Sequence, residues 1–163
     1  MKHKINPMVD CVFKAILGSE NHKPLLIHFL NAILVPYGHK AIKEVTLLNP
    51  YSMMKFETDK LTIVDVKAKD EEDQIFQVEV HLSIEPDLDK HILYNWSEIY
   101  QSQLTQGTEF KELRPVISIW LLDKNLFKNS SGFHHKFIAY DPVQKIQLTE
   151  DFNIHILEVD KWK

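Results

Sequence analysis

The sequence predicts an α/β domain in which helices flank a mixed β-sheet. Apolar residues recur at helical spacing between positions 25 and 34 and between 88 and 104, as in helices that pack on a sheet. Residues 61–69 and 74–83 carry alternating β-branched or aromatic residues, the pattern of strands. Two helices, three strands, a third helix and further strands then follow one another, an order that implies a mixed sheet.

The first two helices are bounded by cap and stop residues. Asn6 as N-cap and Pro7 at the first helical position predict a helix that continues to Gly18. The apolar spacing between Asn21 and Pro36 predicts the second helix. We expect a strand to follow over residues 42–48.

The rest of the chain adds a hairpin, a long helix and a central strand. The acidic residues 70–73 join the two alternating strands and are compatible with a turn. Residues 87–106 predict the longest helix. The uniformly apolar stretch 116–122 predicts a strand that is covered on both faces. Shorter strands are expected over 133–140 and 154–159.

Length and composition indicate one globular domain. The 163 residues include no internal repeat and no Ser/Gly-rich linker, so residues 1–163 are assigned to a single domain. No apolar run approaches the ~18 residues needed to cross a bilayer. The N-terminus lacks an apolar signal region, so we expect a cytoplasmic protein. The single Cys11 excludes an internal disulfide, and we expect its side chain to be buried.

The predicted hairpin brings two carboxylates together. If the hairpin is centred on Glu72, one of its faces is wholly apolar and can pack on a helix. The same register pairs Asp65 with Glu79 on the other face. The expected apolar pairs are Val64 with Val80, Val66 with Val78, and Ala68 with Phe76; the expected polar-face pairs are Ile63 with His81, Lys67 with Gln77, and Asp65 with Glu79.

Two opposed carboxylates indicate a divalent cation between them. Directly opposed residues on antiparallel strands have Cβ atoms roughly 5 Å apart, and like charges there are destabilising. Mg²⁺ commonly binds through one or two carboxylates and completes its shell with water and substrate phosphate. His81, two residues beyond Glu79, is a candidate for proton transfer.

An alternative interpretation places this face in solvent. Asp65 and Glu79 would then form cross-strand ion pairs with Lys67 and Lys69, an arrangement that is common on exposed strands. A register shifted by two residues would also separate the carboxylates diagonally. The histidines, His134-His135 among them, show no spacing typical of a zinc site.

Several segments resemble the PD-(D/E)XK nuclease superfamily, specifically its recombination-promoting nuclease and putative transposase family. The resemblance covers nearly the whole chain and implies a restriction-endonuclease-like fold. Carried over by position, it makes Asp65 and Glu79 ligands of Mg²⁺ or Mn²⁺ and puts His81 where the family usually has Gln or Lys. The similar segments are 63–70 (IVDVKAKD), 76–81 (FQVEVH), 10–18 (DCVFKAILG), 93–104 with Gly107, 114–119 (RPVISI) and 154–159 (IHILEV).

The resemblance also suggests secondary candidates. Tyr100 and Gln103 lie three residues apart on the helix that flanks the family's active site, so they become candidate catalytic residues, with a buried structural tyrosine as the alternative. Lys14, Lys67 and Lys69 are candidate DNA contacts. For Lys14, the alternative is a solvated helix face that it shares with Asp10.

These observations predict a magnesium-dependent DNA endonuclease connected with recombination or mobile elements. Because the net charge is −4, the protein has no general cationic field, and we expect any contact with DNA to be local. One alternative is a catalytically inactive domain of the same fold that binds DNA or a protein partner. Another is a structural or regulatory module without a nucleic-acid role. Double-strand cleavage often uses two sites, so a homodimer is a further expectation.

Overall fold

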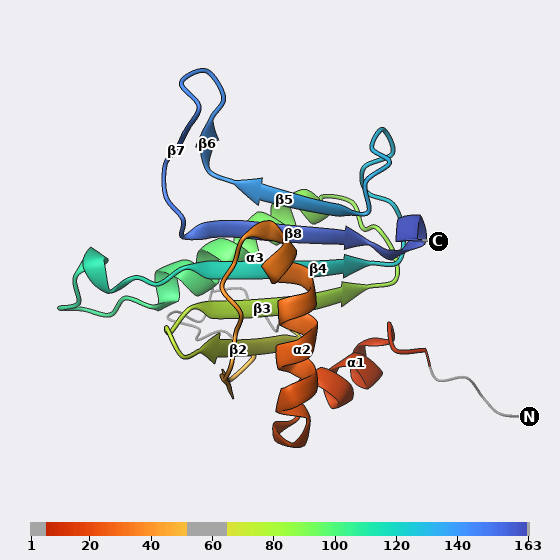
Figure 1. Cartoon of the computed structure of the whole chain (residues 1–163), viewed down its shortest axis with the longest axis horizontal. Helices are drawn as coiled ribbons and strands as arrows, with labels where there is room; N and C mark the ends of the chain where they lie inside the picture. Colours follow the sequence, from red (N-terminus) through yellow and green to blue (C-terminus); the bar gives the residue numbers. More distant parts are fainter. Residues whose placement is uncertain (1–5, 52–64, 163) are drawn as a thin grey trace, which may run out of the picture.

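The computed structural model describes residues 6–51 and 65–162, and its elements follow the predicted order (Figure 1). None of the helices in these two ranges is long and apolar enough to cross a membrane. The helices are α1 (Asp10–Leu17), α2 (Lys23–Leu34) and α3 (Leu88–Ser102); the strands are β1 (Val45–Leu47), β2 (Val66–Asp70), β3 (Ile75–His81), β4 (Val116–Leu122), β5 (His134–Ile138), β6 (Tyr140–Asp141), β7 (Ile146–Gln147) and β8 (Phe152–Glu158).

Six strands form one mixed sheet in the order β1-β2-β3-β4-β8-β5. β3, β4 and β8 run parallel to one another, whereas β1, β2 and β5 are antiparallel to their neighbours. β4 therefore lies inside the sheet, and six of its seven residues are buried. The predicted mixed sheet and its doubly covered strand at 116–122 are both confirmed.

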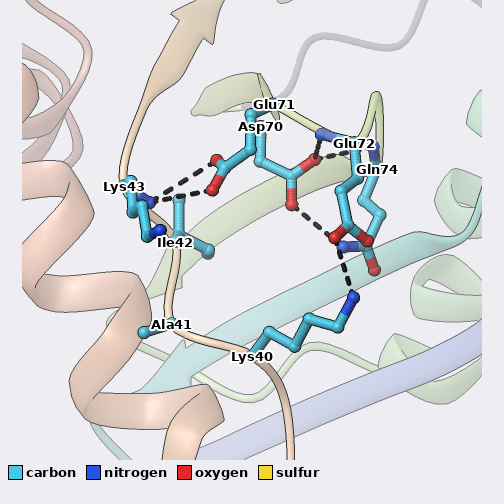
Figure 2. A pocket seen from close by; sticks show the side chains of 8 residues that line it. All are labelled: Lys40, Ala41, Ile42, Lys43, Asp70, Glu71, Glu72 and Gln74. Atoms are coloured by element: carbon cyan, nitrogen blue, oxygen red, sulfur yellow. Dashed lines mark hydrogen bonds and ion pairs between the residues drawn. The ribbon is translucent and has the colours of Figure 1, made fainter.

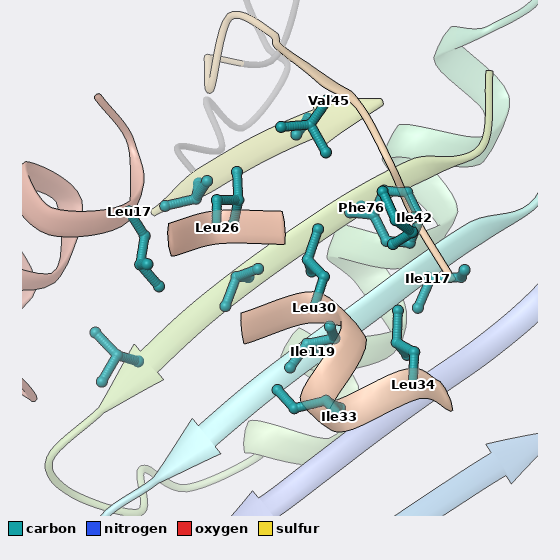
Figure 3. Close-up of a cluster of buried hydrophobic side chains, with 14 of the residues drawn as sticks. Leu17, Leu26, Leu30, Ile33, Leu34, Ile42, Val45, Phe76, Ile117 and Ile119 are labelled. Carbon is teal, nitrogen blue, oxygen red and sulfur yellow. The ribbon is translucent and has the colours of Figure 1, made fainter. Parts of the chain in front are cut away.

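Helices cover the two faces of the sheet and create two apolar layers. α1 and α2 pack on the face that carries Phe76 and Ile119 (Figure 3). α2 presents Leu26, Leu30 and Leu34 to this face, one turn apart, and all three are fully buried. α3 covers the opposite face, where its residues pack with the large side chains of β4 and β8.

The hairpin of β2 and β3 has the predicted register. Its ladder pairs Val66 with Val78, Lys67 with Gln77, and Ala68 with Phe76. The apolar face of the hairpin lies in the core beneath α1 and α2, as expected. The predicted pairs that involve Ile63 and Val64 lie outside the described residues.

The turn of this hairpin is held by side chains (Figure 2). Asp70 Oδ1 accepts hydrogen bonds from the backbone N–H groups of Glu72 and Gln74, at 3.0 and 2.9 Å. Asp73 has φ 60°, the left-handed conformation that Asp tolerates better than most residues. Glu71 accepts the backbone N–H of Lys43, which ties the turn to the segment before β1. These bonds help to pin the register.

The N-terminal helix and Cys11 differ from their predictions. α1 begins at Asp10 rather than at Pro7, because Val9 is extended and Asn6 Oδ1 accepts the N–H of Met8 in a separate turn. Cys11 is exposed, so its expected burial is wrong: the buried side of the short helix is carried by Phe13 and Leu17.

The β6–β7 hairpin is an element that the sequence analysis did not anticipate. Its strands have two residues each, too few for an alternation pattern to show. Its turn contains Lys145 at φ 58°, where Gly or Asn would have been the usual sequence signal. The residues of this hairpin are exposed, and in Figure 1 it extends away from the large sheet.

Candidate active site

Asp65 and Glu79 meet where β2 begins beside β3. The register of the hairpin places Asp65, the residue before β2, opposite Glu79. Asp65 Oδ2 accepts the backbone N–H of Val80 at 2.7 Å, and the backbone N–H of Asp65 in turn donates to the carboxylate of Glu79. The two carboxylates are thus held to each other's strands by reciprocal hydrogen bonds.

Glu79 is buried, which excludes the solvated-face interpretation for this residue. Its exposed fraction is 5%, and the side chain of Asp65 is 9% exposed. Glu79 lies beside Trp120 of β4, on the face that α3 covers. Burial, reinforced by the charge of Asp65, raises the pKa of Glu79 to about 8. In the metal-free protein at neutral pH, Glu79 therefore holds a proton.

Lys14 of α1 forms ion pairs with Asp65 and with Asp10 of its own helix. Its Nζ lies 3.2 Å from Asp65 Oδ1 and 2.9 Å from Asp10 Oδ1. Asp10 and Lys14 lie one helical turn apart, on the same side of α1. Phe13, next to Lys14, is buried in the core, and this packing sets the direction in which both charged side chains point. Burial opposes the charge of Lys14, but Asp10 and Asp65 raise its pKa above the usual value. Lys14 therefore lies against Asp65, with its side chain partly covered, rather than on a fully solvated helix face.

His81 ends β3 two residues beyond Glu79. Its ring centroid lies 5.1 Å from that of Trp120 and 6.1 Å from that of His91. Burial lowers the pKa of His81, although Glu85 and Asp10 oppose the shift. His81 is therefore neutral at neutral pH, and the ammonium charge at this site belongs to Lys14.

Tyr100 and Gln103 lie at the other end of α3, away from the carboxylates. The hydroxyl of Tyr100 donates to Asp151 Oδ2 at 2.6 Å. The side-chain amide of Gln103 makes two hydrogen bonds with the backbone of Arg114, of 2.9 and 3.0 Å. Both side chains therefore join α3 to the segments that precede the parallel strands β8 and β4, and the structure does not bring them together with Asp65 and Glu79.

The two lysines of β2 have different surroundings. Lys69 forms an ion pair with Asp73 at 2.5 Å, at the turn end of the hairpin. Lys67 is half-buried, and this burial lowers its pKa, while Glu98 of α3 opposes the shift. Neither of them contacts Asp65 or Glu79 in the described structure.

A buried hydrogen-bonded chain beside Glu79 was missed by the sequence analysis. Gln77 Nε2 donates to Glu79 Oε1 at 3.1 Å, and Gln77 Oε1 accepts from Ser118 Oγ at 3.0 Å. Trp120 Nε1 donates to Ser118 Oγ at 2.7 Å. The sequence did hold a signal, because Gln77 shares its strand face with Glu79 and Ser118 is the one polar residue in a strand of apolar residues.

The donor set suits a hard divalent cation. Burial, and after it the charge of Asp65, raises the pKa of Glu79, so two ionised carboxylates are unfavourable here without a cation. Within residues 6–51 and 65–162, no three His, Cys, Asp or Glu side chains are arranged to hold a metal. Mg²⁺ does not require such a cage, because one or two carboxylates suffice when water and phosphate complete its shell.

A polar pocket at the hairpin turn is lined by side chains that already hold structural contacts. A cavity of about 310 Å³ lies between residues 40–43 and the turn (Figure 2). Lys40 pairs with Glu72 at 2.9 Å, and both carboxylate oxygens of Asp70 accept hydrogen bonds. These side chains support the fold of the hairpin.

Comparison with known proteins identifies the family. The sequence model of the family described as PD-(D/E)XK nuclease family transposase matches residues 7–163, essentially the whole chain. No curated protein and no solved structure matches the chain. The six-stranded mixed sheet flanked by three helices is consistent with the restriction-endonuclease-like fold. This chain belongs to the PD-(D/E)XK nuclease family transposases.

Proposed function

We propose that this protein is a metal-dependent DNA endonuclease that acts in recombination or in the movement of mobile elements. The observation that carries the proposal is the buried Glu79 beside Asp65, a carboxylate pair whose repulsion a divalent cation would relieve. The family match supports the substrate and the reaction class.

Each residue of the site then has a defined role. Asp65 and Glu79 would hold Mg²⁺ or Mn²⁺, and Glu79 releases its proton when it binds the ion. An ion held there would polarise the scissile phosphate and lower the pKa of the attacking water. Lys14 places its ammonium group beside Asp65, where it neutralises negative charge on the phosphate. The neutral ring of His81 can accept a proton through a ring nitrogen.

Cleavage of plasmid DNA in Mg²⁺ or Mn²⁺ tests this proposal. Asp65→Asn and Glu79→Gln remove a charge at constant side-chain size, and each should lower the cleavage rate by about a hundredfold or more. Glu20→Gln is the matched control, because Glu20 is exposed and its ion pair with Lys23 lies on the surface. Cleavage by Asp65→Asn at the wild-type rate, or no cleavage by the wild type with either ion, would overturn the proposal.

A second candidate function is binding of DNA without cleavage. It is favoured by His81, which stands where the family usually has Gln or Lys and supplies neither an amide nor an ammonium group, and by the ion pairs that already engage Lys14. DNA binding at low salt, where phosphate contacts are strongest, combined with intact DNA in either metal would support it. No DNA binding at low salt would instead favour a module without a nucleic-acid role. A homodimer also stays a prediction, to be tested by sedimentation with and without DNA.

A further inference from the structure

A continuous hydrogen-bonded chain crosses from β4 to β3 and ends at Glu79. It runs from Trp120 Nε1 through Ser118 Oγ and the amide of Gln77 to Glu79 Oε1. The strand pairing builds it, since Gln77 lies beside Ser118 and Glu79 lies beside Trp120 in the parallel ladder. Gln77, Ser118 and Trp120 are completely buried.

The chain has only one favourable direction when Glu79 is ionised. The indole N–H of Trp120 can only donate, so Ser118 Oγ accepts that hydrogen bond. The hydroxyl hydrogen of Ser118 is then free to point at the carbonyl oxygen of Gln77. This arrangement turns the amide N–H group of Gln77 towards Glu79.

The reversed amide would be unfavourable. It would set the carbonyl oxygen of Gln77 against a carboxylate oxygen of Glu79, and two acceptors at 3.1 Å repel each other. It would also direct a second donor at Ser118 and leave the hydroxyl hydrogen without the carbonyl of Gln77. A buried group that loses its partner is destabilising, so Trp120 and Ser118 together select the orientation in which Gln77 donates.

We propose that Gln77, oriented by Ser118 and Trp120, is the positioning residue that holds the carboxylate of Glu79 in place for a divalent cation. The proposal rests on the proposed function only in taking Glu79 as a metal ligand. A glutamate side chain has several rotatable bonds, and metal ligands need an orientation fixed by neighbouring hydrogen bonds. Gln77 acts through Glu79 and does not itself contact substrate.

Metal titration in the absence of DNA tests this role directly. Mn²⁺ binding to the full chain is measured by calorimetry, in wild type and in Gln77→Leu and Gln77→Glu. Gln77→Leu removes the amide, and Gln77→Glu keeps its shape but replaces the N–H donor with an oxygen. We expect each to weaken Mn²⁺ binding by about 10–100-fold, as for other residues that orient metal ligands.

Further variants separate positioning from a merely structural role. Ser118→Ala breaks the chain and should weaken Mn²⁺ binding severalfold, whereas Ser118→Thr keeps the hydroxyl and should restore it. Asn153→Leu is the matched control: it removes a buried amide that donates to Glu150 O, on the opposite face of the sheet, and should leave Mn²⁺ affinity unchanged. Thermal unfolding of each variant checks that it is folded.

The outcomes distinguish this inference from the proposed nuclease function. Wild-type Mn²⁺ affinity in folded Gln77→Leu, or equal loss in Ser118→Ala and Ser118→Thr, overturns the positioning role and leaves the nuclease proposal standing. Metal binding that depends on Gln77 in a protein that cuts no DNA supports the positioning role and removes the nuclease. A wild type that binds no Mn²⁺ overturns both.

Discussion

At the scale of single residues, the main feature of the site is the protonated carboxyl group of the buried Glu79. Burial and the neighbouring Asp65 raise the pKa of Glu79 from 4.5 to about 8, so the folded, metal-free protein binds a proton that the unfolded chain releases. The stabilising effect of this proton is complete below 4.5 and is lost as the pH rises through about 8. A bound cation and this proton therefore compete for Glu79.

This competition predicts a pH-dependent metal affinity. Mn²⁺ binding should tighten as the pH rises towards about 8 and level off above it, because below that pKa each binding event must displace the proton of Glu79. Calorimetry in buffers of different ionisation enthalpy measures the displaced proton. Glu79→Gln, which has no such proton, should show no release at this pH. An affinity that stays constant across the pKa of Glu79 would contradict this account.

Lys14 should affect catalysis and metal binding in opposite directions. Lys14→Met keeps the apolar stem but removes the ammonium that lies 3.2 Å from Asp65. Cleavage should fall about tenfold or more, because a charge that stabilises the transition state is lost. Mn²⁺ affinity should rise, because a competing cation has left Asp65.

The control for Lys14 is Lys23→Met, which breaks the surface pair with Glu20. Rates from single-turnover cleavage and affinities from calorimetry separate the two effects. If Lys14→Met lost cleavage and metal binding together, Lys14 would be holding the site in shape rather than supplying charge.

Strand alternation explains which site residues could be anticipated. It placed Asp65 and Glu79 on one face of the hairpin, and centring the turn on Glu72 set them opposite each other, as the register confirms. The ion pair of Lys14 with Asp65 depends on how α1 docks beside the sheet, which no local pattern encodes. The separation of Tyr100 from the carboxylates has the same origin, since the position of a helix along a strand is a tertiary property.

At the scale of elements, α2 fixes the sheet that carries the site. Leu30 lies at the middle of its buried row, with no exposed surface, whereas Leu25 on the same helix is 46% exposed. Leu30→Ala should lower the free energy of unfolding by about 2–5 kcal/mol through lost burial and a new cavity. Leu25→Ala, the matched control, should cost less than about 1 kcal/mol. Urea unfolding measures both, and equal losses would contradict the packing described here.

The elements that could be predicted are those in which burial imposes a recognisable pattern of apolar residues on the sequence. Residues 116–122 were predicted with the observed ends of β4, because a strand covered on both faces is apolar throughout and Pro115 precedes it. The β6–β7 hairpin has exposed strands and a turn through Lys145, so neither burial nor turn chemistry marked it. The start of α1 was misplaced because the Asn6-Pro7 pair forms a turn of its own.

At the scale of the whole molecule, three histidines join distant parts of the chain. His39 precedes β1, His134 belongs to β5 and His155 to β8. The rings of His134 and His155 are joined by a hydrogen bond of 2.9 Å, and the centroids of His39 and His155 lie 5.6 Å apart. His155 is fully buried, and its Nε2 has no hydrogen-bond partner among the described residues. A protonated, positively charged ring in this cluster would therefore be poorly solvated.

The charges around the cluster also disfavour protonation. Burial, followed by His134, His39 and Lys136, lowers the pKa of His155 to about 3, and burial with His135 lowers that of His134 to about 4. Burial and Lys136 lower the pKa of His39, and the nearby charge of Glu150 opposes this shift. In the unfolded chain these rings take up protons near the ordinary pKa of 6.5. In the folded protein all three stay neutral at that pH, because their pKa values are lower.

This difference predicts that acid unfolds the protein through the cluster. Between 6.5 and the lowered pKa values the unfolded chain binds more protons at these histidines, so their contribution to stability is complete above 6.5 and falls as the pH drops towards 4 and 3. At about 1.4 kcal/mol per pKa unit, the lowering of the pKa of His155 from 6.5 to about 3 corresponds to a loss of about 5 kcal/mol near the acid end. His155→Leu should flatten this decline in urea unfolding followed against pH, whereas His28→Gln, a change at an exposed histidine, should not.

Because His155 lies in β8, beside the β4 strand that orients Glu79, acid should also abolish metal binding as the sheet unfolds. A His155→Leu protein as acid-labile as the wild type would place the sensitivity elsewhere in the sheet.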